Sequence, residues 1–230
     1  MADRQFIPAL GFSWLTRFYD PVVALTCRER RFRNRLLDQA DLQPHARVLD
    51  VACGTATFAL LVKQRFPDCE VAGLDGDAGI LRLAQRKAAR AGVDVTFTHG
   101  LSNAMPYADA SFDAVFASLF FHHLDTGEKL RTLQEVMRVL IPGGGFHICD
   151  WGAGSTRYAR AAFTTVRLLD GFDVTRDNAE GRLPTLMHAA GFHLIHETGR
   201  VETILGTLQL LAAQRSGTAN ALGGLAETEA

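Results

Sequence analysis

The stretch Val48-Leu-Asp-Val-Ala-Cys-Gly-Thr-Ala-Thr57 decides the fold of this chain. It opens with short apolar, β-branched residues around Asp50 and continues through small residues into a helix-like pattern. Small side chains in such a loop let a ligand lie against the backbone. The stretch therefore predicts a strand, a ligand-binding loop and a helix, in that order.

The same unit recurs along the chain. Strands are expected at residues 46–51, 70–74, 93–98, 112–118 and 146–150. Helices are expected at residues 57–66, 78–91 and 127–140, and the last is ended by Pro142 and the glycines 143–145. Parallel strands need crossover connections, so this alternation predicts an α/β fold: a doubly wound, Rossmann-like, mostly parallel sheet with helices on both faces.

The two flanks follow another pattern. Residues 1–44 are expected to form an N-terminal helical cap, in which an aromatic cluster precedes an arginine-rich amphipathic stretch. The main domain is expected to span residues 45–215, and the tail 216–230, rich in Gly, Ala and Thr, is expected to be mobile.

The end of the main domain predicts two helices and a hairpin. Helices are expected up to about residue 169 and at 179–190. The runs 192–197 and 202–212 predict an antiparallel hairpin that turns near Gly199 and completes a sheet of seven strands.

Composition narrows the function. The chain has 230 residues and a formal net charge of -1, so it has no general field that would attract nucleic acid, and a small substrate is expected. Its four cysteines have no metal-ligand spacing, which predicts neither a disulfide framework nor a metal site. No signal peptide or membrane span is evident, so we expect a cytoplasmic protein without stable membrane insertion.

A second acid follows the loop at the spacing found in nucleotide-binding folds. About twenty residues beyond Gly54, the next expected strand ends in Leu74-Asp75-Gly76-Asp77. In doubly wound nucleotide sites, an acid at this position binds the ribose hydroxyls. Either signal is common by itself, but the two in this order predict a nucleoside cofactor, with Asp75 as the ribose ligand.

Four segments together resemble the successive motifs of class I methyltransferases, most closely the UbiE/Coq5-like and type 11 methyltransferase domains. These segments are residues 48–56, 73–77, 111–115 and 138–145. The resemblance implies S-adenosylmethionine as the cofactor, with its methionine end at Asp50 and Gly54 and its adenine at residues 100–102. The full set of cofactor contacts that we expect is Tyr19, Asp50, Ala52, Gly54, Asp75, Gly76, Gly100, Leu101, Ser102 and Ser118.

Two positions depart from the family pattern. Ala56 stands where the family usually has glycine, and Leu101 stands where an acid commonly follows Gly100. An acid lost from the adenine edge removes a hydrogen bond worth about 1 kcal/mol. We therefore expect a lower cofactor affinity than is usual in the family.

Candidates for the chemistry follow the fourth and fifth expected strands. His122 and His123 are the candidate catalytic residues, as a base for an acceptor that must lose a proton; the alternative is that one of them packs or caps the next helix. Asp150 and Trp151 are candidates for the acceptor pocket, and their alternative roles are a turn residue and a core residue. Methyl transfer itself needs mainly proximity and alignment.

Two other functions compete with methyl transfer. Asp75 would suit the ribose of NAD equally well, which makes a Rossmann oxidoreductase the chief alternative. A dinucleotide loop, however, needs GxGxxG, and this loop has one glycine and the carboxylate of Asp50 before it. A catalytically inactive cofactor-binding protein is the second alternative, supported by Ala56 and Leu101.

The acceptor is expected to be small and apolar, amphipathic or lipid-like. The Asn and Gly-His-Arg elements that follow Tyr-Asp in true UbiE enzymes are missing between Tyr19 and Arg33, which argues against a quinone. Whether oxygen, nitrogen or carbon is methylated, and the oligomeric state, stay open.

Overall fold

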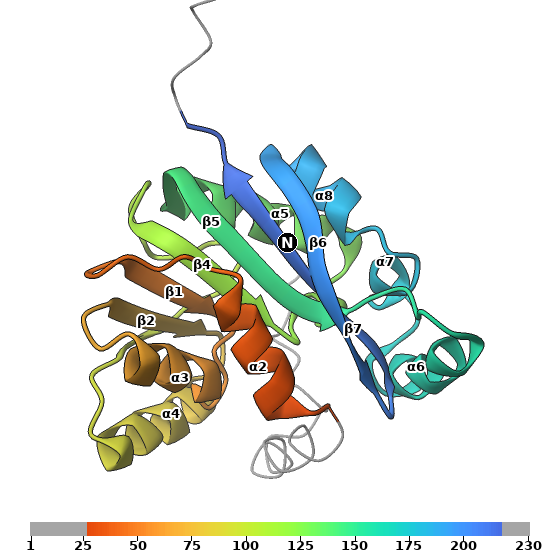
Figure 1. Cartoon of the computed structure of the whole chain (residues 1–230), viewed down its shortest axis with the longest axis horizontal. Coiled ribbons are helices and arrows are strands. Elements are labelled where there is room, and N and C mark those ends of the chain that lie inside the picture. Colours follow the sequence, from red (N-terminus) through yellow and green to blue (C-terminus); the bar gives the residue numbers. More distant parts are fainter. Residues whose placement is uncertain (1–26, 218–230) are drawn as a thin grey trace, which may run out of the picture.

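The computed structural model describes residues 27–217 and contains one seven-stranded sheet (Figure 1). The strand order is β3-β2-β1-β4-β5-β7-β6. The strands are β1 (Arg47–Val51), β2 (Glu70–Asp75), β3 (Thr96–His99), β4 (Phe112–Ser118), β5 (Leu140–Trp151), β6 (Phe192–Thr203) and β7 (Gly206–Arg215). Strands β1 to β5 pair in parallel, whereas β7 pairs antiparallel with β5 and β6. The expected Rossmann-like sheet with a C-terminal antiparallel hairpin is confirmed.

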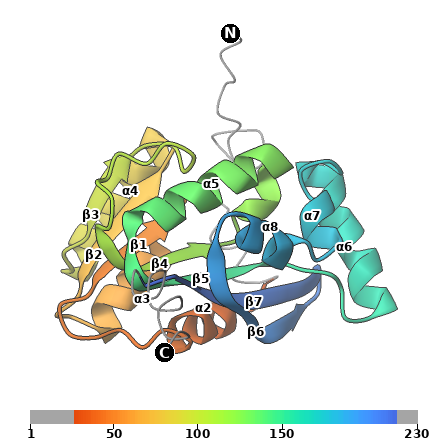
Figure 2. The same ribbon diagram turned by 90° about the horizontal axis from the view of Figure 1, so that it is seen from above.

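Helices cover both faces of the sheet. They are α2 (Glu29–Asp38), α3 (Thr57–Arg65), α4 (Ala78–Ala91), α5 (Thr126–Val139), α6 (Arg157–Asp170), α7 (Arg176–Ala179) and α8 (Leu183–Ala189), with a 3-10 turn, η1, at Phe121–His123. Figure 2 shows α2 and α3 on one side of the sheet and α5 and α8 on the other.

Strand alternation supplies a separate core to each face. Val48 and Phe116 point to the face that packs against α2, α3 and α4, while Leu49 and Val115 point to the face covered by α5 and α8. Because both faces are buried, the central strands are apolar almost throughout, as expected of parallel strands. Asp50, between Leu49 and Val51, is the buried exception in β1.

Three expectations about the later elements were wrong. Residues 142–145 were expected to precede the fifth strand, but they lie within β5, which begins at Leu140. Phe112 of β4 pairs with Leu140 and Ala114 pairs with Gly145, so β5 has extra residues between these two pairs. The hairpin does not turn at Gly199; that glycine follows a register shift in β6, and the turn lies between Thr203 and Gly206.

The third correction concerns the helix expected at residues 179–190. It is divided into α7 and α8, because Gly181 takes φ 69° between them and a proline lies in the first turn of α8.

Some expectations lie outside the described residues. Tyr19 and most of the expected N-terminal cap precede residue 27, and most of the expected tail follows residue 217. Within the part that the structure describes, no helix combines the length and apolar character needed to cross a membrane.

Candidate cofactor and acceptor site

The carboxyl ends of the parallel strands gather polar side chains at one edge of the sheet. Asp50 and Asp150 each lie one residue from the end of their strands, β1 and β5, while Asp75 ends β2 and Ser118 ends β4. The chain order reverses between β1 and β4, and such a switch point is where open α/β sheets bind ligands.

Asp50 is a buried acid with an unused acceptor. Its side-chain oxygen Oδ2 has no hydrogen-bond partner among the described residues, and the residue is 2% exposed. Burial raises the pKa of Asp50 from 3.8 to about 7, although the positive charge of Arg33 acts in the opposite direction. An unpartnered buried carboxyl is costly in the free protein and would be stabilised by a cationic ligand.

The loop after β1 has the backbone of a ligand-binding turn. Ala52, Gly54 and Ala56 all have φ between 54° and 63°, in the left-handed region. For the two alanines this conformation costs about 1–2 kcal/mol each. A Cβ placed on Gly54 would meet no atom within 4 Å, so the backbone there faces open space. Strain of this kind, held by its surroundings, is typical of functional loops.

Asp75 ties this loop to the next strand. Its Oδ2 accepts a hydrogen bond from the Gly54 amide at 2.9 Å, and its Oδ1 accepts one from the Asp77 amide at 2.9 Å. Burial raises the pKa of Asp75. Each carboxylate oxygen can accept a second hydrogen bond, so both remain able to bind ribose hydroxyls. The contact with the ribose itself stays a prediction. The neighbouring Gly76 carbonyl faces the ring Nε2 of His99 at 3.0 Å.

The expected adenine segment is partly engaged within the protein. The Ser102 hydroxyl hydrogen-bonds the Thr132 hydroxyl at 3.0 Å. Gly100 is closely packed, since an added Cβ would come within 3.0 Å of Pro106. Leu101 is 52% exposed and offers an apolar surface where the family commonly has an acid. Contacts of these residues with adenine stay predictions.

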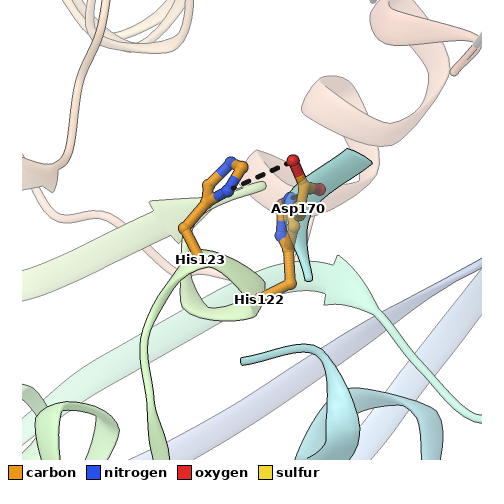
Figure 3. Close-up of side chains that lie close together, drawn as sticks. All are labelled: His122, His123 and Asp170. Carbon is orange, nitrogen blue, oxygen red and sulfur yellow. Dashed lines mark ion pairs between the residues drawn. The ribbon is translucent and has the colours of Figure 1, made fainter. Parts of the chain in front are cut away.

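Both histidines lie in η1, directly after β4 (Figure 3). His122 Nδ1 lies 2.6 Å from Asp150 Oδ1, and its Nε2 lies 3.7 Å from Asp170 Oδ2. His123 Nδ1 lies 3.7 Å from Asp170 Oδ1, and the two imidazole rings are 4.0 Å apart. We call His122, His123 and Asp170 the histidine cluster. Its polar atoms converge at the same sheet edge as Asp50 and Asp75.

The environment of the histidine cluster controls its charge. Burial, together with the neighbouring His122, lowers the pKa of His123 to about 3. Burial by itself would raise the pKa of Asp150, but His122 beside it brings that pKa below its usual value. Burial raises the pKa of Asp170, which lies at the end of α6.

Asp150 stands behind His122. It is 1% exposed, and its Oδ2 accepts hydrogen bonds from the amides of Phe120 and Phe121, at 3.0 and 2.7 Å. It therefore fixes both η1 and the His122 ring. Trp151 is buried in the core and packs against Phe163, with ring centroids 5.4 Å apart. A direct contact of either residue with an acceptor stays a prediction.

Sequence reasoning missed two residues of this region. Asp170 comes from the far end of α6, and no spacing in the sequence connects it with the histidine pair. Arg33 belongs to the arginine-rich stretch of the expected cap; it is buried, it pairs with Glu29 at 2.8 Å, and its charge acts on Asp50. The apolar positions Phe32, Leu36 and Leu37 mark the buried side of α2 and could have indicated that Arg33 borders it.

Comparison with known proteins finds similarity to methyltransferases. Residues 48–144 match a family described as "Methyltransferase domain". The demethylmenaquinone methyltransferase of Thermus thermophilus is 40% identical over 121 residues, which are 53% of this chain and 54% of that protein. The enzyme of the same name from Deinococcus radiodurans is 38% identical over 116 residues, 50% of this chain and 47% of that protein. The chain thus spans about half the length of these curated relatives.

Solved structures share the fold at low identity. The YcgJ protein of Bacillus subtilis superimposes with a TM-score of 0.67 at 16% identity, over 81% of this chain and 99% of that one. A SAM-dependent methyltransferase from Aquifex aeolicus gives 0.61 at 20% identity, over 80% and 89%. At these identities the likeness establishes the fold.

Proposed function

We propose that this protein is a class I methyltransferase that transfers the methyl group of S-adenosylmethionine to a small acceptor. The match of residues 48–144 to a methyltransferase domain is the starting point of this proposal. When bound, the cofactor supplies an electrophilic methyl group on a sulfonium. The protein holds the cofactor and the acceptor in line, and such alignment can lower the barrier by about 7–11 kcal/mol.

The observation that carries this proposal is the orphaned carboxyl oxygen of Asp50. An α-ammonium is the cationic partner that would satisfy Oδ2 and allow the buried acid to ionise. Arg33, whose charge already acts on Asp50, is suited to the carboxylate of the same methionine group. A pyrophosphate placed against Asp50 would be repelled, so the site favours an amino-acid moiety over a dinucleotide.

Asp75 and the loop complete the proposed cofactor site. Asp75 is assigned to the ribose, and the open backbone at Gly54 is assigned to the face of the cofactor. Gly100, Leu101 and Ser102 are assigned to the adenine, with Leu101 contributing apolar contact in place of the usual acid.

The histidine cluster is assigned to the acceptor. The cluster lies beyond the end of β4, and β4 is the neighbour of β1 in the sheet. Asp150 holds the His122 ring in one orientation. His122 and His123 therefore activate or orient the group that receives the methyl. A small apolar or amphipathic acceptor is proposed; the names of the relatives add demethylmenaquinone to the acceptors to be tested. A cytoplasmic location stays a prediction.

The test is calorimetric titration of the full chain with S-adenosylmethionine, S-adenosylhomocysteine and NAD. We expect micromolar affinity for the first two ligands and at least tenfold weaker binding of NAD. Turnover is then followed by mass spectrometry with demethylmenaquinone and with a panel of small phenols. Equal or tighter binding of NAD would refute the proposed cofactor. Binding of S-adenosylmethionine without methylation of any acceptor would favour the inactive cofactor-binding alternative.

A further inference from the structure

The donor atoms of the histidine cluster converge without bonding to one another. One nitrogen from each imidazole and a carboxylate oxygen of Asp170 all lie within 4.8 Å of one another. The two nitrogen-to-oxygen distances of 3.7 Å are too long for hydrogen bonds. They are close to the separation of about 3.4 Å between neighbouring ligands of a tetrahedral ion with bonds of about 2.1 Å.

We propose that His122, His123 and Asp170 bind a divalent transition-metal ion through His122 Nε2, His123 Nδ1 and the Asp170 carboxylate. Two imidazoles and one carboxylate leave further coordination positions open, as in catalytic metal sites. Figure 3 shows both rings directed toward Asp170 from the same turn of chain. The sequence did not predict this site, because Asp170 is far from the histidine pair along the chain.

The group behind His122 strengthens the assignment. Metal-bound histidines usually donate their other ring nitrogen to a carboxylate or carbonyl, which fixes the tautomer and the ring orientation. Asp150 Oδ1 lies 2.6 Å from His122 Nδ1 and also accepts the Trp151 amide. With a proton on Nδ1, the lone pair of Nε2 faces Asp170. Asp150, the His122 ring and the proposed ion therefore form the carboxylate–histidine–metal arrangement that is common in metal sites.

The local charges suit a dication. Burial, and in addition the negative charge of Asp150, raises the pKa of the Asp170 carboxyl, and within the described residues neither carboxylate has an ion pair with a lysine or arginine. Lys129, a buried cation whose charge acts on His123, is paired with Asp177 at 3.3 Å. Asp170 also lies at the last residue of α6, where the helix dipole is negative and favours a cation over a second acid.

The site has access on one side. The His122 side chain is 4% exposed and that of Asp170 is 11% exposed, but that of His123 is 28% exposed. An ion held here has its free positions on the His123 side. This role rests on the proposed function: the free position takes the acceptor's oxygen as its anion, after the proton has left to solvent, next to the methyl donor. Acceptors with an acidic or chelating hydroxyl are the matching substrate class.

The experiment is a titration of the chelator-treated full chain with Co²⁺, followed by its visible d–d absorption, and with Zn²⁺, followed by calorimetry. We expect one equivalent to bind. His123→Ala and Asp170→Asn should each weaken binding at least tenfold, while Asp150→Asn should weaken it about 10–100-fold through the His122 ring. His188→Ala, which removes an exposed histidine of α8, should leave binding unchanged. Circular dichroism and binding of S-adenosylhomocysteine show whether each variant is folded.

Two results would overturn the metal site. One is the lack of a stoichiometric Co²⁺ or Zn²⁺ equivalent in the parent chain. The other is a metal affinity that folded His123→Ala and Asp170→Asn proteins retain. If either is found while the metal-free chain still binds S-adenosylhomocysteine, the metal inference fails and the proposed function stands. If the chain binds metal but no S-adenosylhomocysteine, the site stands and the proposed function fails.

Discussion

Replacement of Asp50 by asparagine should raise the stability of the free protein and weaken its binding of the cofactor. In the folded chain the pKa of Asp50 is raised from 3.8 to about 7, so the buried acid is favoured in its neutral form. Its contribution to stability is therefore present below pH of about 4 and is lost as the pH rises through about 7. Asparagine has a similar volume and does not titrate, so the variant loses this pH dependence.

The magnitude follows from the size of the shift. At about 1.36 kcal/mol per pKa unit, ionisation of Asp50 costs the free protein about 4 kcal/mol at pH 8 and about 1.5 kcal/mol at pH 5. In a chain of this length, 1 kcal/mol moves the melting temperature by about 2–4 °C. The gain in melting temperature of Asp50→Asn over the parent should therefore be roughly 5–10 °C larger at pH 8 than at pH 5.

The assay is thermal unfolding at the two pH values, with and without S-adenosylhomocysteine. The ligand should stabilise the parent at pH 8 and should stabilise Asp50→Asn much less, because an amide cannot neutralise the ammonium. Asp113→Asn is the control, since that carboxylate is half-exposed and pairs with Arg47 at 3.1 Å. The reasoning is refuted if the gain of Asp50→Asn is the same at pH 5 and pH 8, or if the variant keeps full stabilisation by the ligand.

Three further outcomes are expected. Asp75→Ala should weaken S-adenosylhomocysteine binding by roughly 2–3 kcal/mol in calorimetry, because charge-assisted bonds to the ribose are lost; unchanged affinity in a folded variant would place the ribose elsewhere. Leu101→Asp, at an exposed position, should tighten binding by about 1 kcal/mol by restoring an acceptor at the adenine edge, and weaker binding would count against that assignment. Lys129→Met should lower the free energy of unfolding by about 3–5 kcal/mol in urea denaturation, because it leaves Asp177 buried without its lysine; a change below about 1 kcal/mol would show that Thr126 and the backbone suffice.

Local signals in the sequence were enough to predict the elements around the cofactor loop. Helix α4 begins and ends as expected because the Asp77 side chain caps its first amides and Gly92 ends it with φ 65°. Strand β4 matches its expected bounds because its central apolar run, residues 114–117, is buried on both faces. In these cases the residues that determine the element lie inside it or next to it.

Other features depend on contacts that the sequence does not mark. Gly199 has the composition of a turn, but pairing with β7 makes the chain continue to Thr203. Asp170 meets the histidine pair only because α6 returns to the sheet edge after β5. The buried position of Arg33 likewise depends on how α2 packs on the sheet. Local composition cannot distinguish such cases, since tertiary packing decides them.

The carboxylate of Asp75 accepts a bond from the amide of Gly54, and this makes the two ends of the proposed cofactor site one mechanical unit. A fragment that binds only the ribose end, such as adenosine, would also restrain the loop at the methionine end. Part of the ordering entropy of the loop would then be lost in the first binding event, and the second fragment would bind to a loop that is already ordered. Adenosine and a methionine analogue should accordingly bind with positive cooperativity, which favours linked cofactor analogues over optimisation of either half by itself.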